Sequence, residues 1–574
     1  MTVIKKKRKY GRLSRGYSRT NRNQAGMGWF EKGIIKKDHG CGLNIVLVYP
    51  GTYRTGASNL GLQVLYRIIN GRSGSLAERC FISSKGTPKS VESARPLSDF
   101  DVIAFTIPFE EGAWNVARAL IRAGLSPRPE DRRKHDPLVV AGGMAPTMNP
   151  EPYLSMVDAV GLGDAEVLVP RALDNLEIEP KASLEQKIEA IRKVDGWLTF
   201  DATPDFSVTR QFLFQLTGGG QPAATTVLCP DAELGSMALI EVARGCVRGC
   251  RFCASGYVCR PPRFWPLDDM EREIARLSDL AGKVGLVASD LSDHPELEEI
   301  IDMVEKNGAK ASPSSLRADK VSLELLDKLS KHGLRTLTMA PEVGREDLRR
   351  AINKDMEDQV LVDAGYMAGK TGIPNLKLYF ILGLPGQEDD DIHAMVHIVE
   401  KISKARERGA ARSKGSTGMT HVSLSLFVPK PGTPLQWSGM KDPATLNMYL
   451  KQAKKSLSKI GGVRVNAESL KSVYRQALLS RGSREVGNAL VQSVESGIDI
   501  DSILNSLGLD PNWIAFAERS GAADLPWDRV GHGTGTEVLL RERDLLRQGK
   551  PSANCTPGKN CHRCDIGRQK ICPG

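Results

Sequence analysis

Glu241-Val-Ala-Arg-Gly-Cys246-Val-Arg-Gly-Cys250-Arg-Phe-Cys253 is the stretch that decides the fold of this 574-residue chain. It follows the apolar run Met237-Ala-Leu-Ile240 and predicts a strand that ends in a tight, glycine-rich loop. Such a loop can bring three thiolates together, as an iron–sulfur cluster requires. Because clusters usually take four thiolates, one iron would stay open to a small chelating molecule. The alternatives are a zinc knuckle, with Cys259 or a distant residue as fourth ligand, and free core cysteines.

The C-x3-C-x2-C spacing, with Phe252 before the last cysteine, resembles the signature of the radical S-adenosylmethionine (SAM) superfamily. The resemblance implies that Cys246, Cys250 and Cys253 hold a [4Fe-4S] cluster whose open iron is chelated by the amino and carboxylate groups of SAM. Reduction would then cleave SAM to a 5′-deoxyadenosyl radical, which requires a low-potential electron donor such as flavodoxin or ferredoxin. Cys259 is expected to be a passive thiol and not a ligand.

Composition indicates a protein of several domains in a reducing compartment. Eleven cysteines, eight of them in two short groups, are typical of metal sites and not of a disulfide framework. No apolar run approaches the roughly 18 residues of a membrane span, and no hydrophobic stretch follows the charged N-terminus. We therefore expect a cytoplasmic protein without membrane contact.

Most of the net charge lies at the N-terminus. Residues 1–40 contain twelve Lys and Arg against Glu31 and Asp38, a net charge of +10 out of +11 for the whole chain. The sequence predicts a basic disordered tail over 1–40 that contacts RNA or a ribosome through phosphate attraction. A solvated arm that aids solubility is the alternative.

Residues 41–205 are expected to form a Rossmann-like domain, and residues 206–235 a linker. Short apolar runs separated by helical patterns and glycine-rich loops predict a doubly wound parallel sheet. The expected strands are Leu43–Tyr49, Asp101–Ile107, Leu138–Ala141 and Met156–Gly163.

Two glycine-containing segments of this domain, 141–152 and 161–166, resemble the cobalamin-binding-like domain that precedes many radical SAM barrels. The cobalt-ligating Asp-x-His-x-x-Gly motif of that family is replaced by Gly51-Thr-Tyr-Arg-Thr-Gly56. The resemblance therefore implies cobalamin bound without a histidine ligand. A Rossmann-like substrate or dimer module is the alternative.

Residues 236–445 predict a (β/α)6 partial barrel with its site at the carboxyl ends of the strands. The expected strands begin at Met237 and continue with Val284–Ala288, Ala311–Arg317, Thr336–Ala340, Asn375–Leu382 and Val422–Val428. Met339-Ala-Pro-Glu-Val-Gly344 and the stretch 380–388 resemble barrels of methylthiotransferases and Elongator-type enzymes.

Several residues at these strand ends are candidates for binding SAM. Glu342 is suited to the ribose hydroxyls or the ammonium group, and Arg317 to the carboxylate. The full expected SAM-binding set is Ser314, Ser315, Arg317, Glu342, Phe380 and Gly383. In the proline-rich loop that follows the last expected strand, Lys430 and Trp437 are expected to face substrate, although structural packing is the alternative for Trp437.

The C-terminal part is expected to contain helices over 446–550 and a Cys-rich metal-binding tail over 551–574. The tail has the spacing Cys555-x5-Cys561-x2-Cys564-x7-Cys572. We favour a second iron–sulfur cluster there, and a zinc site is the alternative.

Taken together, these features predict a radical SAM enzyme that transfers a methyl or methylthio group onto RNA or protein. One alternative is a metal-stabilised RNA- or ribosome-associated binding protein without radical chemistry. Another is a radical SAM enzyme of small-molecule biosynthesis.

Overall fold

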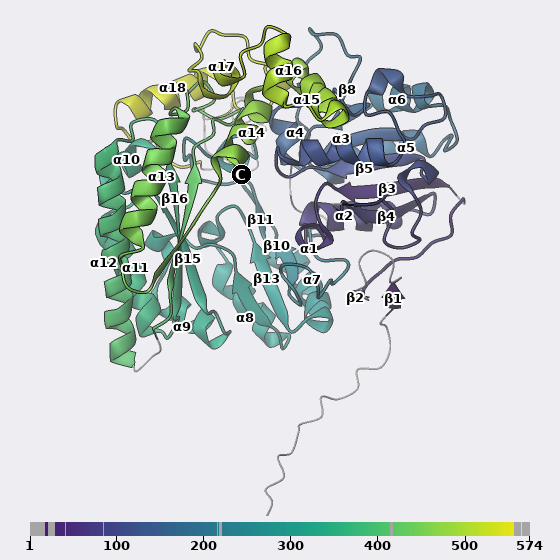
Figure 1. The fold of residues 1–574 in the computed structure, drawn as a ribbon. Helices are drawn as coiled ribbons and strands as arrows, with labels where there is room; N and C mark the ends of the chain where they lie inside the picture. Colours follow the sequence, from purple (N-terminus) through teal and green to yellow (C-terminus); the bar gives the residue numbers. More distant parts are fainter. Residues whose placement is uncertain are drawn as a thin grey trace, which may run out of the picture.

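The computed structural model describes residues 18–20, 29–40, 42–83, 85–214, 216, 221–413, 417–555 and 564. These residues form an α/β protein in which a doubly wound sheet is followed by a second parallel array and a group of helices, as predicted. Figure 1 shows the doubly wound sheet on the right, the second array on the left and the late helices above both. Within the described residues, no helix is long and apolar enough to cross a membrane.

The N-terminal sheet is built from strands that are buried along almost their whole length. They are β3 (Leu43–Tyr49), β4 (Ser75–Phe81), β5 (Val102–Thr106), β6 (Leu138–Gly142), β7 (Ala159–Gly161) and β8 (Trp197–Thr199). Their order is β4-β3-β5-β6-β7-β8, and only the β7-β8 pair is antiparallel. The strand order reverses between β3 and β5, and ligands bind beyond the carboxyl ends of the strands at such a point.

Helices cover both faces of this sheet, which explains why its strands are buried on both sides. On one face, α2 and α5 pack against each other and bury Leu62 and Leu168. On the other face, α3 buries Trp114. The bounds are α1 (Tyr53–Gly56), α2 (Leu60–Asn70), α3 (Gly112–Arg122), α4 (Met144–Met148), α5 (Ala165–Leu176) and α6 (Leu184–Arg192).

The second array contains seven parallel strands in two adjoining sheets, one more than the six predicted βα units. The strand orders are β10-β13-β14 and β15-β16-β17-β18. The backbone N–H of Leu316 donates to the carbonyl of Thr338 at 3.0 Å and so joins the two sheets. The bounds are β10 (Ala238–Glu241), β13 (Lys283–Val287), β14 (Lys310–Pro313), β15 (Thr336–Glu342), β16 (Asn375–Leu382), β17 (Thr420–Leu426) and β18 (Val463–Ala467).

Strand β18 lies inside the region 446–550 that was predicted to be helical. The helix expected from residue 446 is α13, which crosses over from β17 and leads into β18. The helices that alternate with the strands are α7 (Leu267–Leu280), α8 (Leu297–Lys306), α9 (Leu323–Lys331), α10 (Glu346–Ala351), α11 (Asp358–Lys370), α12 (Asp389–Ser413) and α13 (Pro443–Leu457).

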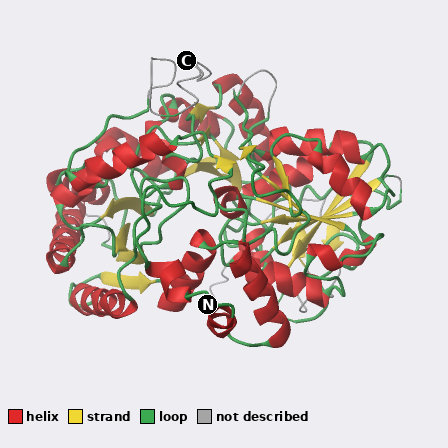
Figure 2. Cartoon of the chain, turned by 90° about the horizontal axis from the view of Figure 1, so that it is seen from above, coloured by secondary structure: helices red, strands yellow, loops and turns green. Residues whose placement is uncertain are grey.

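The helices that follow β18 pack against both domains. Figure 2 shows the whole arrangement from above. Helix α15 contacts α3, and the side chain of Asn149 donates to the carbonyl of Gly482 at 2.8 Å. The bounds are α14 (Leu470–Arg481), α15 (Arg484–Ser496), α16 (Ile500–Ser506), α17 (Pro511–Phe516) and α18 (Thr536–Arg547).

Part of the predicted disordered tail is ordered. Residues 31–40 pack on the N-terminal domain, and β2 (Trp29–Glu31) pairs with β1 (Ser18–Thr20). The carboxylate of Glu31 is buried and accepts hydrogen bonds from Arg79 at 2.8 and 3.0 Å and from the Tyr53 hydroxyl at 2.7 Å. The basic cluster Lys5 to Lys9 lies outside the described residues.

The predicted linker, residues 206–235, also contains a short strand that pairs with another part of the chain. Strand β9 (Val208–Thr209) pairs in parallel with β19 (Val530–Gly531), which belongs to the C-terminal region. Further along, the backbone N–H of Val227 donates to the Gln63 side chain at 2.8 Å. Residues 206–235 therefore connect the domains through specific contacts.

His532 joins the C-terminal region to the N-terminal domain. Its Nε2 donates to the carbonyl oxygens of Thr147 and Met148, each at 3.1 Å. Burial lowers the pKa of His532 to about 4, so the imidazole is neutral in the folded protein near pH 7. This is a structural role and not a catalytic one.

We expect His532 to make stability depend on pH. Below its unfolded pKa of 6.5 the unfolded chain binds a proton that the folded chain takes up only near pH 4, so stability is lost as pH falls between these values. Between about pH 7 and about pH 5 this loss should reach about 2 kcal/mol. Urea unfolding at both pH values should show the loss in the wild type and a smaller one in His532→Gln. Equal losses in the two proteins would contradict this role.

Candidate functional site

The three cysteines of the C-x3-C-x2-C motif lie on one loop at the carboxyl end of the second parallel array. The loop follows β10 and the short strand β11 (Ala243–Arg244), which pairs with β12 (Arg263–Phe264). Cys250 is buried, and Cys246 and Cys253 are half-buried. Each of the three sulfurs lies within electrostatic range of the others.

Two arginines within the motif anchor this loop on different sides. Arg248 donates to both carboxylate oxygens of Asp293, each at 2.5 Å, beyond the end of β13. Arg251 has no exposed surface, and it donates to Glu542 of α18 at 3.1 and 3.2 Å and to the carbonyl of Ala351. Because a buried charge is costly unless it is paired, the Arg251–Glu542 contact fixes the loop against the C-terminal helix.

Asn353 is a second anchor of the loop. It has a left-handed backbone, with φ of 58°, and its side chain donates to the carbonyl of Gly249 at 3.0 Å. The same side chain accepts from the backbone N–H of Ser552 at 2.9 Å. The backbone N–H of Cys555 donates to the carbonyl of Val247 at 2.7 Å. The segment 552–555 is therefore held directly against the cysteine loop.

Positive charge surrounds the buried thiol of Cys250. Burial raises the pKa of Cys250 to about 11, while Lys354 and Arg317 lower it. Lys354 is paired with Glu342 at 2.9 Å. Burial lowers the pKa of Lys354, but Glu342 and Cys250 more than offset this and hold that pKa above its ordinary value. Cationic neighbours of this kind stabilise the thiolate that a metal requires.

The expected SAM-binding residues lie around this loop in different environments. Ser314 is exposed and Ser315 half-buried, just after β14. Two of the three guanidinium nitrogens of Arg317 donate to Asp319, at 2.9 and 3.0 Å, and its backbone N–H donates to the Ser292 hydroxyl at 2.8 Å. Its guanidinium is thus already paired, although it lies within electrostatic range of Cys250.

The other three residues expected to bind SAM are Glu342, Phe380 and Gly383, and their surroundings differ. Glu342 ends β15 with φ of 72°, and its carboxylate binds Lys354. Gly383 follows β16 with φ of 87°, and a side chain there would meet Leu446. Phe380 is 1% exposed and lies in the core on the buried face of β16, while Ile381 is on the other face. Phe380 was expected to bind SAM, but alternation along the strand turns its ring into the core.

The proline-rich loop also differs from the expectation. Lys430 donates to Glu110 of the N-terminal domain at 2.5 Å and joins the two domains. Trp437 is 2% exposed and packs in a cluster with Tyr257 and Trp527. Trp437 therefore does not face substrate, and the alternative of structural packing is correct.

Two cysteines of the C-terminal motif, Cys561 and Cys572, lie outside the described residues. Cys555 and Cys564 are buried, with 4% and 1% exposure. Within the described chain, no three Cys, His, Asp or Glu side chains converge closely enough to share one metal ion. The cysteines of a cluster bind separate irons and stand further apart than the ligands of one ion.

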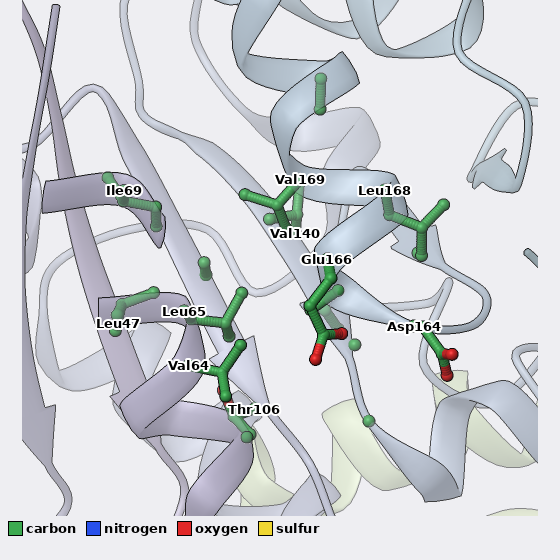
Figure 3. Close-up of a pocket in the computed structure, with 18 of the residues that line it drawn as sticks. Leu47, Val64, Leu65, Ile69, Thr106, Val140, Asp164, Glu166, Leu168 and Val169 are labelled. Carbon is green, nitrogen blue, oxygen red and sulfur yellow. The ribbon is translucent and has the colours of Figure 1, made fainter. Parts of the chain in front are cut away.

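Two cavities border the N-terminal sheet. The first, of about 300 Å³, is an apolar slot between the sheet and helices α2 and α5. Figure 3 shows Val64, Val140 and Leu168 lining it, together with Asp164 and Glu166. The second, of about 400 Å³, lies between this sheet and the cysteine loop. We call them the sheet slot and the interdomain cavity.

Sequence reasoning missed the residues that position the loop. Lys354, Asn353 and Glu542 carry no motif of their own, and they reach the loop from distant parts of the chain. Arg248 and Arg251 are within the motif, and an arginine between cysteines was the available signal for charged anchors.

Comparison with known proteins gives two family matches. The family described as radical SAM proteins, N-terminal, matches residues 61–198, and the radical SAM superfamily matches residues 240–399. The uncharacterized protein MJ0966 of Methanocaldococcus jannaschii is 27% identical over 458 residues, which are 78% of this chain and 90% of that protein. A tRNA-2-methylthio-N(6)-dimethylallyladenosine synthase of Fervidobacterium nodosum is 24% identical over 247 residues, 39% of this chain and 52% of that protein.

Two solved structures of low similarity were also found. The radical SAM methyltransferase TsrM from Kitasatospora setae, with cobalamin and a [4Fe-4S] cluster bound, has a TM-score of 0.48 and 12% identity, and the match covers 80% of this chain and 100% of that one. The cobalamin-dependent SAM radical enzyme OxsB has a TM-score of 0.47 and 14% identity, covering 83% and 64%. On the two family matches, the chain belongs to the radical SAM superfamily, whose enzymes use a [4Fe-4S] cluster and SAM.

Proposed function

We propose that Cys246, Cys250 and Cys253 hold the [4Fe-4S] cluster at which this enzyme cleaves SAM reductively. The observation that carries the proposal is that three thiols lie on one anchored loop, within electrostatic range of one another, at the carboxyl end of β10. A cluster on three cysteines keeps one iron open for SAM and supplies the electron that cleaves its sulfonium. A flavodoxin or ferredoxin is the expected electron donor.

The residues around the loop fit this chemistry. Lys354 and Arg317 supply positive charge beside Cys250 and offset the negative charge of three thiolates. Four residues at the same strand ends are proposed to bind SAM. They are Ser314, Ser315, Glu342 and Gly383. To bind the SAM carboxylate, Arg317 must first release Asp319.

We further propose methyl or methylthio transfer onto RNA or protein as the reaction. The partial similarity to a tRNA methylthiolating synthase supports this class of reaction and covers 39% of the chain. The four C-terminal cysteines are proposed to bind a second cluster, with zinc as the alternative. A purely binding role is disfavoured by the superfamily membership, whereas small-molecule biosynthesis is the competing enzymatic role.

Cobalamin is the second cofactor that we propose, and the sheet slot supports it. The slot runs along one face of the sheet to the carboxyl ends of β5 and β6, where ligands bind in doubly wound sheets, and its lining is mostly apolar. Two buried polar atoms in its lining, Thr106 Oγ1 and Trp197 Nε1, have no hydrogen-bond partner among the described residues. Such atoms are available to hydrogen-bond with the part of a ligand that enters the slot.

Cys250→Ala should abolish formation of 5′-deoxyadenosine from SAM. The loss of one of three ligands should also remove most of the iron and sulfide that this loop holds. The measurement is 5′-deoxyadenosine by liquid chromatography after anaerobic reduction with dithionite. Cys80→Ala, which changes a buried thiol in the N-terminal core, is the matched control and should keep the product. Product formation by Cys250→Ala at the wild-type rate would refute the ligand assignment.

Lys354→Met should make the cluster harder to reduce. Removal of a positive charge beside Cys250 disfavours the more negative, reduced state, and the midpoint potential should fall by on the order of 50 mV. Lys354→Arg keeps the charge and should stay near the wild-type value. Redox titration followed by electron paramagnetic resonance (EPR) spectroscopy measures both. A potential unchanged in Lys354→Met would show that Lys354 lies too far away to act on the cluster.

Gly142→Leu should prevent cobalamin binding while leaving the fold intact. Gly142 lines the sheet slot, and a Cβ there meets only the carbonyl of Gly161 at 3.7 Å, which is ordinary contact. A leucine would therefore fill the slot without backbone strain. Gly142→Ala is the matched control that adds only the Cβ. Retained cobalamin should be measured by absorbance after incubation and desalting, and equal retention by Gly142→Leu and the wild type would contradict the proposal.

A further inference from the structure

The interdomain cavity is lined by polar groups from both domains. Its polar and charged lining includes Thr147, Arg210, Arg244, Ser255, Cys259 and Ser289. The cavity lies between the carboxyl ends of the N-terminal sheet and the cysteine loop. A cavity of this size with convergent polar groups beside the reacting centre is where a substrate group is expected.

One of its two arginines is fully paired. Arg244 lies 2.7 Å from Glu166, 2.7 Å from Glu241 and 3.2 Å from Asp164. Asp164 also accepts from Arg263 at 2.8 Å. The acidic groups of the cavity wall are thus already committed to Arg244 and Arg263.

Arg210 has a different set of partners. It is 5% exposed, and within the described residues no carboxylate lies within ion-pairing distance of it. Its guanidinium donates to the carbonyl of Arg260 at 2.5 Å, makes a long contact of 3.5 Å to the carbonyl of His532, and stacks on Phe212 at 4.9 Å. Carbonyl contacts account for two of its three nitrogens. The nearest negative charge, Asp164, attracts Arg210 without a direct ion pair and is shared with Arg244 and Arg263.

A buried cation without a direct ion pair is costly, and a bound anion lowers that cost. We propose that the interdomain cavity binds an oxyanion group of the substrate, a phosphate or a carboxylate, through Arg210. This inference rests on the proposed function, because it names the substrate class of the same site. Arginine suits the role, since its planar fork binds either oxyanion with two hydrogen bonds.

Cys259 provides a reporter inside the cavity, because it lines the same space and is not a proposed cluster ligand. The test compares alkylation of Cys259 by iodoacetate, an anion, and by iodoacetamide, a neutral reagent of similar size. The Cys259 thiolate attacks the CH2 carbon of either reagent and displaces iodide, so the ratio of the two rates does not depend on the pKa of the thiol. Peptide mass spectrometry of the cluster-containing full-length protein resolves Cys259 from the other cysteines.

Arg210→Met should lower the iodoacetate-to-iodoacetamide ratio at least about tenfold, the factor that about 1.4 kcal/mol of charge-assisted hydrogen bonding produces. Arg210→Lys should keep most of the ratio. Arg529→Met is the matched control and should not change it, because the Arg529 guanidinium binds Glu151 and the carbonyls of Thr203 and Phe206. Iodoacetamide should still alkylate Cys259 in Arg210→Met, more slowly because loss of the cation raises the pKa of the thiol, and this reaction shows that the cavity is intact.

Protection assays distinguish the two oxyanions. Inorganic phosphate should slow iodoacetate more than acetate does if the substrate group is a phosphate, and the reverse order indicates a carboxylate. A wild-type ratio no higher than that of Arg210→Met, or a Cys259 that reacts with neither reagent, would overturn the proposal. Loss of the ratio on addition of SAM would assign the cation to the SAM carboxylate and overturn it as well. None of these measurements requires SAM cleavage, so they can fail while 5′-deoxyadenosine still forms.

Discussion

The rest of the structure depends on the burial of Arg251 against Glu542. A guanidinium with no exposed surface must keep its carboxylate, since breaking a buried pair costs about 3–5 kcal/mol. Because Arg251 lies between Cys250 and Cys253, this requirement fixes the cysteine loop to the C-terminal helix α18. The contacts of Asn353 with Gly249 and Ser552 hold the same loop from its other side.

The N-terminal sheet and the second array present their carboxyl ends to one another, and ligands of parallel sheets bind at such ends. The interdomain cavity lies between them, with Arg244 bridging Glu166 of the first domain and Glu241 of the second. Lys430 and Glu110 make a further bridge, and His532 ties the C-terminal region to α4. These contacts fix the carboxyl ends of the two sheets relative to each other. A molecule bound at the N-terminal sheet is therefore kept close to the cysteine loop.

Much of the architecture could be predicted from local pattern. Continuous apolar runs such as Leu43–Tyr49 are typical of strands buried on both faces, and the cysteine spacing identified the loop. Strand β18 was missed because its alternation of apolar and polar residues spans only the five residues Val463–Ala467. The order of residues 31–40 was missed because it depends on Glu31 meeting Arg79, a contact between distant positions.

The residues of the candidate site also fall into two groups, those that the local sequence predicts and those that only the fold brings together. The cysteines follow from spacing, whereas the pairing of Lys354 with Glu342 and of Arg251 with Glu542 depends on tertiary folding and has no local signature. Phe380 and Trp437 were assigned to ligands because both follow or flank strand ends, but burial determines their roles.

The most direct test of the account is the EPR spectrum of the anaerobic, dithionite-reduced protein with and without SAM. If three cysteines leave one iron open, SAM binds that iron and changes the g values of the cluster signal, and Cys250→Ala loses this signal. A wild-type cluster signal that SAM does not alter would mean that all four irons are already ligated, and would contradict the account.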